Sequence, residues 1–240
     1  LLPDRHMLKI AFAPEYVLPL PVNHRFPISK YELIPLQLLH EGTATADNFF
    51  EPKILDPEIV ALTHTRAYIQ RLQNLEMTAS EMRKIGFPQT PELMKREFII
   101  AGGTLECCEF AGQFGVALNV AGGTHHAFAD KGEGFCLLND CAIAANYLLH
   151  KNKTEKILIV DLDVHQGQGT AKIFEREPRV FTFSMHGKNN YPLHKEKSTL
   201  DVELPDGMID EDYLALLYNH LPAIICLLYT SPSPRDGLLS

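Results

Sequence analysis

The chain has 240 residues, of which 45% are hydrophobic, and its formal net charge is −8. This length and apolar content fit a single domain with a sizeable core. The acidic balance, without a block of Lys and Arg, argues against a protein that binds nucleic acid directly. No apolar run reaches the roughly 18 residues of a membrane span. The five cysteines include no Cys-x-x-Cys pair, which favours free thiols in a reducing cytoplasm.

Both ends of the chain are predicted to be non-native. Met7 opens a run typical of a first strand, so residues 1–6 are interpreted as upstream translation. The stretch from Cys226 to Asp236 matches one reading frame of a common transposase sequencing adapter, although a natural Ser/Pro-rich tail is the alternative. We therefore expect residues 7–225 to be the N-terminal portion of one domain, and residues 226–240 to be adapter-derived.

Strands and helices are predicted to alternate along the chain. Ser29 and Thr90 each precede a helical pattern at an N-cap position, and Pro91 fits the first helical turn. Alternation of this kind predicts a parallel sheet covered on both faces, in a three-layer α/β/α arrangement. Strands are expected at 9–13, 116–120, 156–162 and 180–184, and helices at 30–40, 65–75, 90–110, 137–150, 169–177 and 211–221, with a short helix starting at Asp56-Pro57.

A polar run at the end of one predicted strand indicates a metal site. The apolar residues 157–160 are followed by Asp161, Asp163 and His165, which alternate with apolar side chains. In an extended chain these three would share one face. Two carboxylates so close together repel each other unless a cation or a proton intervenes. Asp163 and His165 are therefore candidate zinc ligands, and a catalytic zinc needs a third protein ligand that is not evident in the sequence.

Polar clusters follow three of the predicted strands. They occupy residues 122–126, 161–165 and 184–187, and sites in parallel α/β sheets form beyond the carboxyl ends of strands. The tandem His125-His126 is interpreted as an acid/base pair. Asp161 is placed to orient one of these histidines, and Gln168 can hydrogen-bond to the other without a charge.

These motifs resemble the histone deacetylase superfamily, which has the arginase–deacetylase fold. The matching stretches are residues 122–127, 134–140 and 161–167, in that order. The His165-Gln166-Gly167 sequence is most similar to the bacterial branch related to class IV deacetylases. The resemblance implies a parallel central sheet, truncated here, and a zinc-dependent amide hydrolase.

The resemblance also implies roles for individual residues. Asp163 and His165 would bind zinc, and His126 would be the general base, with His125 as its electrostatic partner. Asp161 would lie behind His125, and Gln168 stands where many members have an aspartate. The residues implied for the acyl-lysine channel are Gly134 and Phe135, and those implied around a structural potassium are Asp161, Asp163, His165, Ser184 and Met185.

The sequence therefore predicts a zinc-dependent deacylase that hydrolyses the amide of acetyl-lysine in a protein. The family's third zinc ligand and its oxyanion tyrosine are expected beyond the end of this chain, which on its own is predicted to be inactive. One alternative is a small-molecule amidohydrolase that acts on acetylpolyamines or in an acetoin pathway. Another is a binding module without catalytic activity.

Overall fold

Helices and parallel strands alternate along residues 8–229, the part of the chain that the computed structural model describes. Two 3-10 turns, Pro14–Tyr16 and Ala46–Asn48, are also present. The strands are β1 (Lys9–Ala11), β2 (Phe49–Phe50), β3 (Ala117–Asn119), β4 (Ile157–Asp161), β5 (Val180–Gly187) and β6 (Leu200–Leu204). The helices are α1 (Lys30–His40), α2 (Pro57–Val60), α3 (Arg66–Gln73), α4 (Ala79–Ile85), α5 (Pro91–Phe114), α6 (Asp140–His150), α7 (Gln168–Phe174) and α8 (Asp210–Tyr229).

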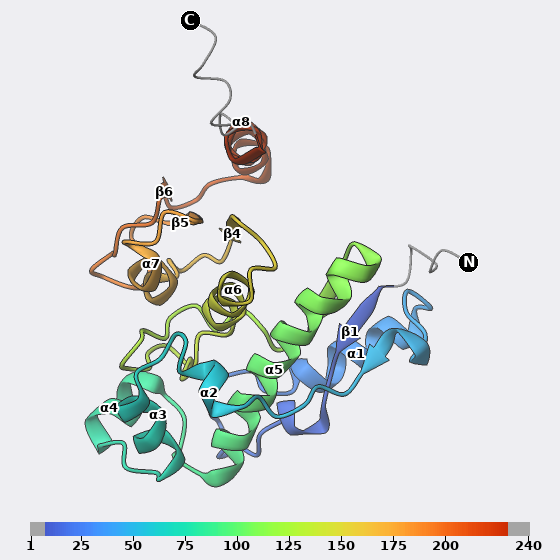
Figure 1. The fold of residues 1–240 in the computed structure, drawn as a ribbon, viewed down its shortest axis with the longest axis vertical. Coiled ribbons are helices and arrows are strands. Elements are labelled where there is room, and N and C mark those ends of the chain that lie inside the picture. The colour runs from blue at the N-terminus through green and yellow to red at the C-terminus, as the bar shows by residue number, and fades with distance from the viewer. Residues whose placement is uncertain (1–7, 230–240) are drawn as a thin grey trace, which may run out of the picture.

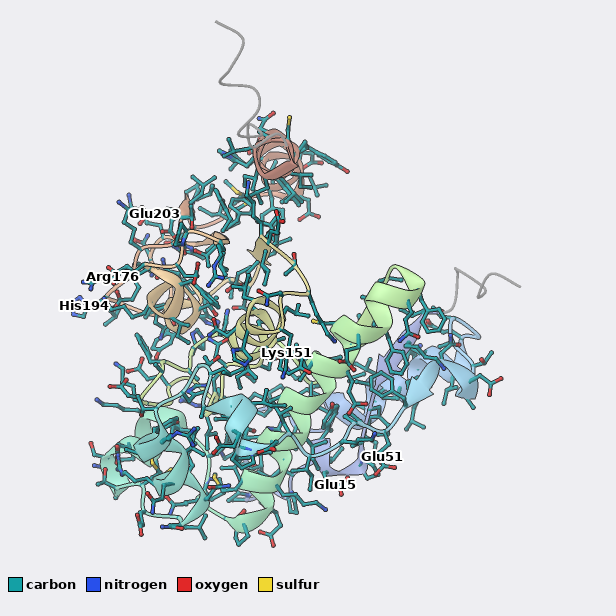
Figure 2. All side chains as sticks on the ribbon, viewed as in Figure 1. Glu15, Glu51, Lys151, Arg176, His194 and Glu203 are labelled. Carbon is teal, nitrogen blue, oxygen red and sulfur yellow. The ribbon has the colours of Figure 1, made fainter. Side chains whose placement is uncertain are left out.

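The strands form two parallel three-stranded sheets, with the orders β2-β1-β3 and β4-β5-β6. Helix α5 packs against β1 and β3, and α6 packs against α5. In Figure 1, α6 lies between α5 and the second sheet, and α8 stands beyond that sheet. The charged side chains of Glu51, Arg176 and Glu203 lie at the periphery (Figure 2).

The second sheet is covered on both faces by helices. Ile157 and Ile159 of β4 pack with residues of α6 and α7, whereas the intervening Leu158 packs in the cluster that includes Ile224 of α8. Adjacent side chains of a strand point to opposite faces, so both faces of β4 are apolar. The predicted three-layer α/β/α architecture with parallel strands is therefore confirmed, and the strands described here fall into two sheets.

Side-chain caps explain why several helices begin where they do. The side chains of Asp56, Thr65, Thr90 and Asn139 each accept a hydrogen bond from a backbone N–H of the first turn. Ser29 makes no such bond, so its predicted capping role is wrong, although α1 does begin at Lys30. The backbone of Ser29 is itself helical, which turns its hydroxyl away from the first-turn N–H groups.

Three elements have no counterpart among those predicted, and α8 is longer than predicted. β2 was missed because it spans only two residues. α4 and β6 do carry local signals, a capping box at Thr78 and an alternation of apolar and acidic residues over Leu200–Leu204. Helix α8 continues past Pro222, where burial of Ile224 stabilises the last turns. Residues 226–229 lie in this helix, whereas residues 1–6 and 230–240 of the predicted non-native ends lie outside the described residues.

None of the helices within residues 8–229 combines the length and the apolar character that crossing a bilayer requires.

Four strands pair on one side only within residues 8–229, and two of them, β3 and β4, carry exposed large apolar side chains. β3 is the last strand of one sheet and β4 the first of the other. Leu118 of β3 is 44% exposed and Val160 of β4 is 37% exposed. A strand with open N–H and C=O groups and apolar side chains is a template for pairing with another chain.

We therefore predict that this chain self-associates through these edges. Val160→Lys should shift the chain toward the monomer in sedimentation velocity, because a charge on an edge strand opposes pairing. Val22→Lys is the matched control, since Val22 is 91% exposed but lies in a loop. A monomeric parent chain, or an equal effect of both substitutions, would contradict the prediction.

Candidate active site

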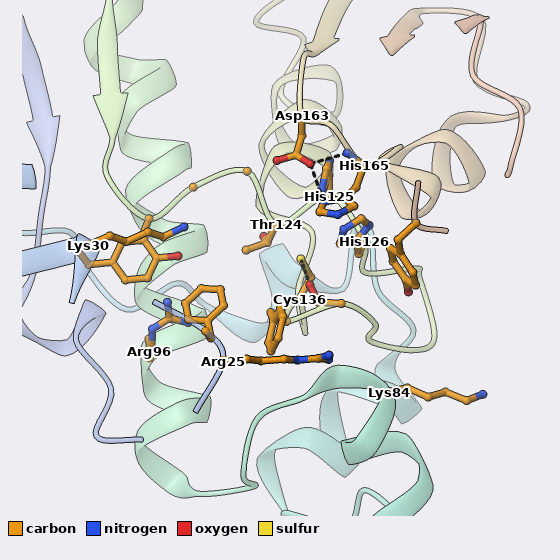
Figure 3. A pocket seen from close by; sticks show the side chains of 18 residues that line it. Arg25, Lys30, Lys84, Arg96, Thr124, His125, His126, Cys136, Asp163 and His165 are labelled. Carbon is orange, nitrogen blue, oxygen red and sulfur yellow. Dashed lines mark hydrogen bonds and ion pairs between the residues drawn. The ribbon is translucent and has the colours of Figure 1, made fainter. Parts of the chain in front are cut away.

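A cavity of about 590 Å³ opens where the loops after β3 and β4 meet. The loop after β3 contributes residues 121–126, and the loop after β4 contributes Asp163 and His165. Figure 3 shows Asp163, His165, His125 and His126 together on one side of this pocket, with Lys30 and Arg96 on the other. Two of the three polar clusters noted in the sequence thus converge on one pocket, whereas residues 184–187 do not line it.

Asp163 and His165 lie in a loop and not on a strand. β4 ends at Asp161, so the expected alternation of side chains on an extended face does not apply to the next four residues. Instead, Oδ1 of Asp161 accepts from the backbone N–H of Asp163 at 3.1 Å, and Oδ1 of Asp163 accepts from that of His165 at 2.7 Å. These side-chain-to-backbone turns place Asp163 and His165 side by side.

Asp163 and His165 remain accessible for binding a cation. Their side chains are 50% and 40% exposed, and Nδ1 of His165 lies 3.0 Å from Oδ1 of Asp163. Partial burial tends to raise the pKa of Asp163, but hydrogen bonds from His165 and the charges of His125 and His165 lower it overall. Asp163 is therefore held as a carboxylate, the form that ligates a metal.

Within residues 8–229 these two donors are not joined by a third. No group of three or more His, Cys, Asp or Glu side chains in this part of the chain is arranged to hold a metal ion. One carboxylate and one imidazole suit zinc in type, but a catalytic zinc takes three protein ligands. The described residues therefore supply two donors of a kind that suits zinc, and zinc binding at this place stays a prediction.

His125 is paired with Asp161 across the gap between the two motifs. Nδ1 of His125 lies 2.5 Å from Oδ2 of Asp161, and because a carboxylate only accepts, Nδ1 is the donor. Burial opposes protonation of the ring, but the hydrogen bond and the charge of Asp161 raise the pKa of His125. A side chain at Gly167 would collide with this carboxylate, so the close approach requires glycine there.

His126 has an amide partner where His125 has a carboxylate. Its Nδ1 lies 2.6 Å from Oε1 of Gln168, and its ring centroid is 4.1 Å from that of His125. Burial, reinforced by the charge of His125, lowers the pKa of His126 to about 4, and the bond to Gln168 only partly offsets this. His126 is therefore neutral near pH 7, as a general base must be.

Two fully buried residues hold in place the loop that carries the two histidines. Asp140 accepts hydrogen bonds from the backbone N–H groups of Gly123 and Thr124, and Asn139 donates to the carbonyl of Ala127. The side chain of Asn139 also caps α6 by accepting from the N–H of Ala142. One residue therefore starts a helix and holds the loop that carries His125 and His126.

Gly134 and Phe135, predicted to line a substrate channel, do face the pocket. Both have positive φ, and a Cβ at Gly134 would lie 2.5 Å from Cδ2 of His126, so a glycine is required against that ring. The N–H groups of these two residues donate to the carbonyls of Lys84 and Ile85 in α4. The missed helix α4 thus anchors this wall of the pocket.

Three of the five residues predicted around a potassium ion, Asp161, Ser184 and Met185, lie next to one another in the sheet, whereas Asp163 and His165 lie in the loop after β4. Asp161 is paired in register with Ser184 across β4 and β5, and Ser184 and Met185 are both buried. The hydroxyl of Ser184 lies 2.9 Å from Nδ1 of His186. The potassium site itself stays a prediction.

Two residues of the site were not singled out in the sequence. Tyr191 lines the pocket, and its ring lies edge-on to that of His126 with centroids 5.1 Å apart. Glu133 accepts hydrogen bonds from Gln168 and from the hydroxyl of Tyr191. Neither residue belongs to a recognisable spacing with the histidines, and only the folded loops bring them together.

The double role of Asn139 leads to a stability prediction. Asn139→Ala should lower the free energy of unfolding by about 2–4 kcal/mol, because it removes a helix cap and leaves buried polar groups unpaired. The matched control is Thr90→Ala, which removes a cap that bonds only to the N–H of Leu93 and should cost about 1 kcal/mol. Urea denaturation measures both, and equal losses would contradict the role assigned to Asn139.

Comparisons with known proteins agree with this geometry. A model of the histone deacetylase domain matches residues 24–228. The chain is 41% identical over 216 residues to an uncharacterized protein of Picosynechococcus, covering 90% of this chain and 72% of that protein. It is 32% identical over 182 residues to the acetoin utilization protein AcuC of Bacillus subtilis, covering 71% of this chain and 46% of that protein.

A solved structure shares the fold. The crystal structure of a histone deacetylase homologue from Aquifex aeolicus superposes with a TM-score of 0.78 at 24% identity, covering 91% of this chain and 64% of that one. The chain thus spans less than two thirds of both the Bacillus and the Aquifex proteins.

Proposed function

Because this chain belongs to the histone deacetylase family, we propose that the complete protein is a zinc-dependent deacylase that hydrolyses the amide of acetyl-lysine. The observation that carries the proposal is the pair of adjacent histidines beside a carboxylate and an imidazole in one pocket. Each histidine has its Nδ1 hydrogen-bonded from behind, by Asp161 or by Gln168. This arrangement leaves an imidazole nitrogen of each ring for proton transfer.

The two histidines are suited to different roles. His126, which is neutral, takes a proton from the attacking water and returns it to the leaving lysine amine. His125, whose pKa is raised beside Asp161, supplies positive charge next to the developing negative charge. Gly134, Phe135 and Tyr191 form the wall along which an acyl-lysine side chain would extend.

Asp163 and His165 are the residues that we propose as zinc ligands. Bound zinc would supply polarisation of the amide carbonyl. We infer that the third ligand lies outside residues 8–229, because no third His, Cys, Asp or Glu within this range completes the site. We propose that a hydroxyl donor to the oxyanion lies there as well, as the resemblance to the histone deacetylase family implies. On this proposal the 240-residue chain by itself does not turn over substrate.

A second candidate substrate is a small acetylated amine. The 32% identity to a protein named for acetoin utilization favours keeping this candidate. Rates of the complete protein on an acetyl-lysine peptide and on N-acetylputrescine separate the two, because a small-molecule enzyme should prefer the latter. A complete protein that binds both compounds and hydrolyses neither is the binding module without catalytic activity.

Two further parts of the proposal concern a second metal ion near the site and the location of the protein in the cell. We propose a structural potassium ion beside Asp161, Ser184 and Met185, supported by their adjacency in β4 and β5. We also propose a cytoplasmic location, since Cys107, Cys108, Cys136 and Cys141 form no disulfides.

The ligand assignment leads to a prediction for Asp163→Ala. In the complete protein this substitution should abolish deacetylation of an acetyl-lysine peptide. In the present chain it should weaken zinc binding at least about tenfold, measured by titration calorimetry, because loss of even a supporting partner of a ligand costs that much. Asp206→Ala is the matched control, since Asp206 is an exposed carboxylate that bonds to Asn189. Full activity and unchanged zinc affinity in Asp163→Ala would show that the assignment is wrong.

A further inference from the structure

We propose that Glu133 is a positioning residue that fixes the tautomer of His126 by orienting the side-chain amide of Gln168. Oε2 of Glu133 lies 3.1 Å from Nε2 of Gln168, whose Oε1 lies 2.6 Å from Nδ1 of His126. The three side chains form a line from a carboxylate, through an amide, to an imidazole. Gln168 is 2% exposed and His126 is 6% exposed, so water does not compete freely for these bonds.

The direction of every hydrogen bond in this line follows from Glu133. A glutamate carboxylate only accepts, so the end of the Gln168 amide that faces Glu133 must be the NH₂ group. The other end, which faces His126, must then be the carbonyl oxygen. Because that oxygen only accepts, Nδ1 of His126 must carry the ring hydrogen.

Without Glu133, nothing else among the described residues selects this orientation. The remaining neighbour of the Gln168 amide is the hydroxyl of Tyr191, at 3.5 Å. A hydroxyl both donates and accepts, so it fits either end of the amide. Burial beside Glu133 raises the pKa of Tyr191 to about 12, so its hydroxyl stays protonated and donates to Glu133 at 3.2 Å.

Glu133 is itself held in place. Its backbone N–H and carbonyl form a two-way bridge with Cys136, at 3.0 and 2.9 Å. Lys131 contacts the other carboxylate oxygen, Oε1, at 3.3 Å, which leaves Oε2 to Gln168 and Tyr191. The side chain is 18% exposed.

The tautomer matters for the chemistry, and this consequence rests on the proposed function. With the hydrogen on Nδ1, the opposite nitrogen Nε2 has a free lone pair and can take a proton. No hydrogen bond occupies Nε2 of His126 among residues 8–229. If the Gln168 amide were flipped, its NH₂ would face Nδ1, the ring hydrogen would move to Nε2, and the base would be lost.

The test is a tautomer measurement on the present chain, which needs neither zinc nor activity. Long-range ¹H–¹⁵N spectra of histidine-labelled protein near pH 7 distinguish Nδ1–H from Nε2–H, and His126→Asn identifies the signals of His126. We expect the Nδ1–H tautomer in the parent chain and loss of this single pattern in Glu133→Gln, because glutamine can accept or donate. Tyr191→Phe is the matched control and should keep Nδ1–H. Parent spectra showing Nε2–H, or an unchanged pattern in a folded Glu133→Gln, would overturn the proposal.

A second measurement separates this proposal from the proposed function. In the complete protein, Glu133→Gln should lower kcat by about two- to tenfold at unchanged KM, in proportion to the lost Nδ1–H population, and Glu133→Asp should restore part of it. A tautomer change without any deacetylase activity in the parent protein supports the positioning role and contradicts the function. A lowered kcat with an unchanged tautomer contradicts the positioning role alone.

Discussion

The hydrogen bond between His125 and Asp161 joins the two halves of the molecule at the site. His125 belongs to the loop after β3, in one sheet, and Asp161 is the last residue of β4, in the other. The N–H of Thr170 in α7 also donates to the carbonyl of His125, which strengthens the same junction. The geometry of the pocket therefore depends on two separate sheets being held at one distance, and short polar contacts set that distance.

The same contacts shift the pKa values of the two adjacent histidines in opposite directions. A carboxylate behind His125 favours its protonated form, whereas an uncharged amide behind His126 gives much less compensation for burial. A positive charge on His125 then lowers the pKa of its neighbour further. Two identical side chains, adjacent in sequence, thereby become one candidate cation and one candidate base.

Patterns among residues that are close in the sequence were enough to predict much of the fold and about half of the residues of the site. Caps at Asp56, Thr65 and Thr90 and the apolar runs of β4 and β5 follow from near neighbours in the chain, and so they can be predicted. The division into two sheets could not be predicted, because it depends on which strands pair. The continuation of α8 past Pro222 also depends on tertiary burial, of Ile224, which overrides the local preference of proline to end a helix.

The residues of the site divide in the same way. Asp163 and His165 lie in one short run with Asp161, and spacing alone marked them, although the turns that gather them are not those of a strand. The pairing of His126 with Gln168 could be predicted only from the resemblance to a family, because 42 residues separate the two in the sequence. Glu133 and Tyr191 are 58 residues apart and meet through loops of irregular structure, for which the sequence holds no periodic signal.

Both histidines are connected to a carboxylate, one directly and one through an amide. A carboxylate cannot donate, so each line of hydrogen bonds has a fixed direction and each ring carries its hydrogen on Nδ1. The electrostatic effect of a carboxylate on a ring, however, weakens with distance and is strongest for the direct contact between Asp161 and His125. Inserting Gln168 between Glu133 and His126 therefore keeps the orientation that a carboxylate imposes while removing most of its effect on basicity. An amide at this position separates control of the tautomer from control of the pKa, which an aspartate in direct contact with the ring would couple.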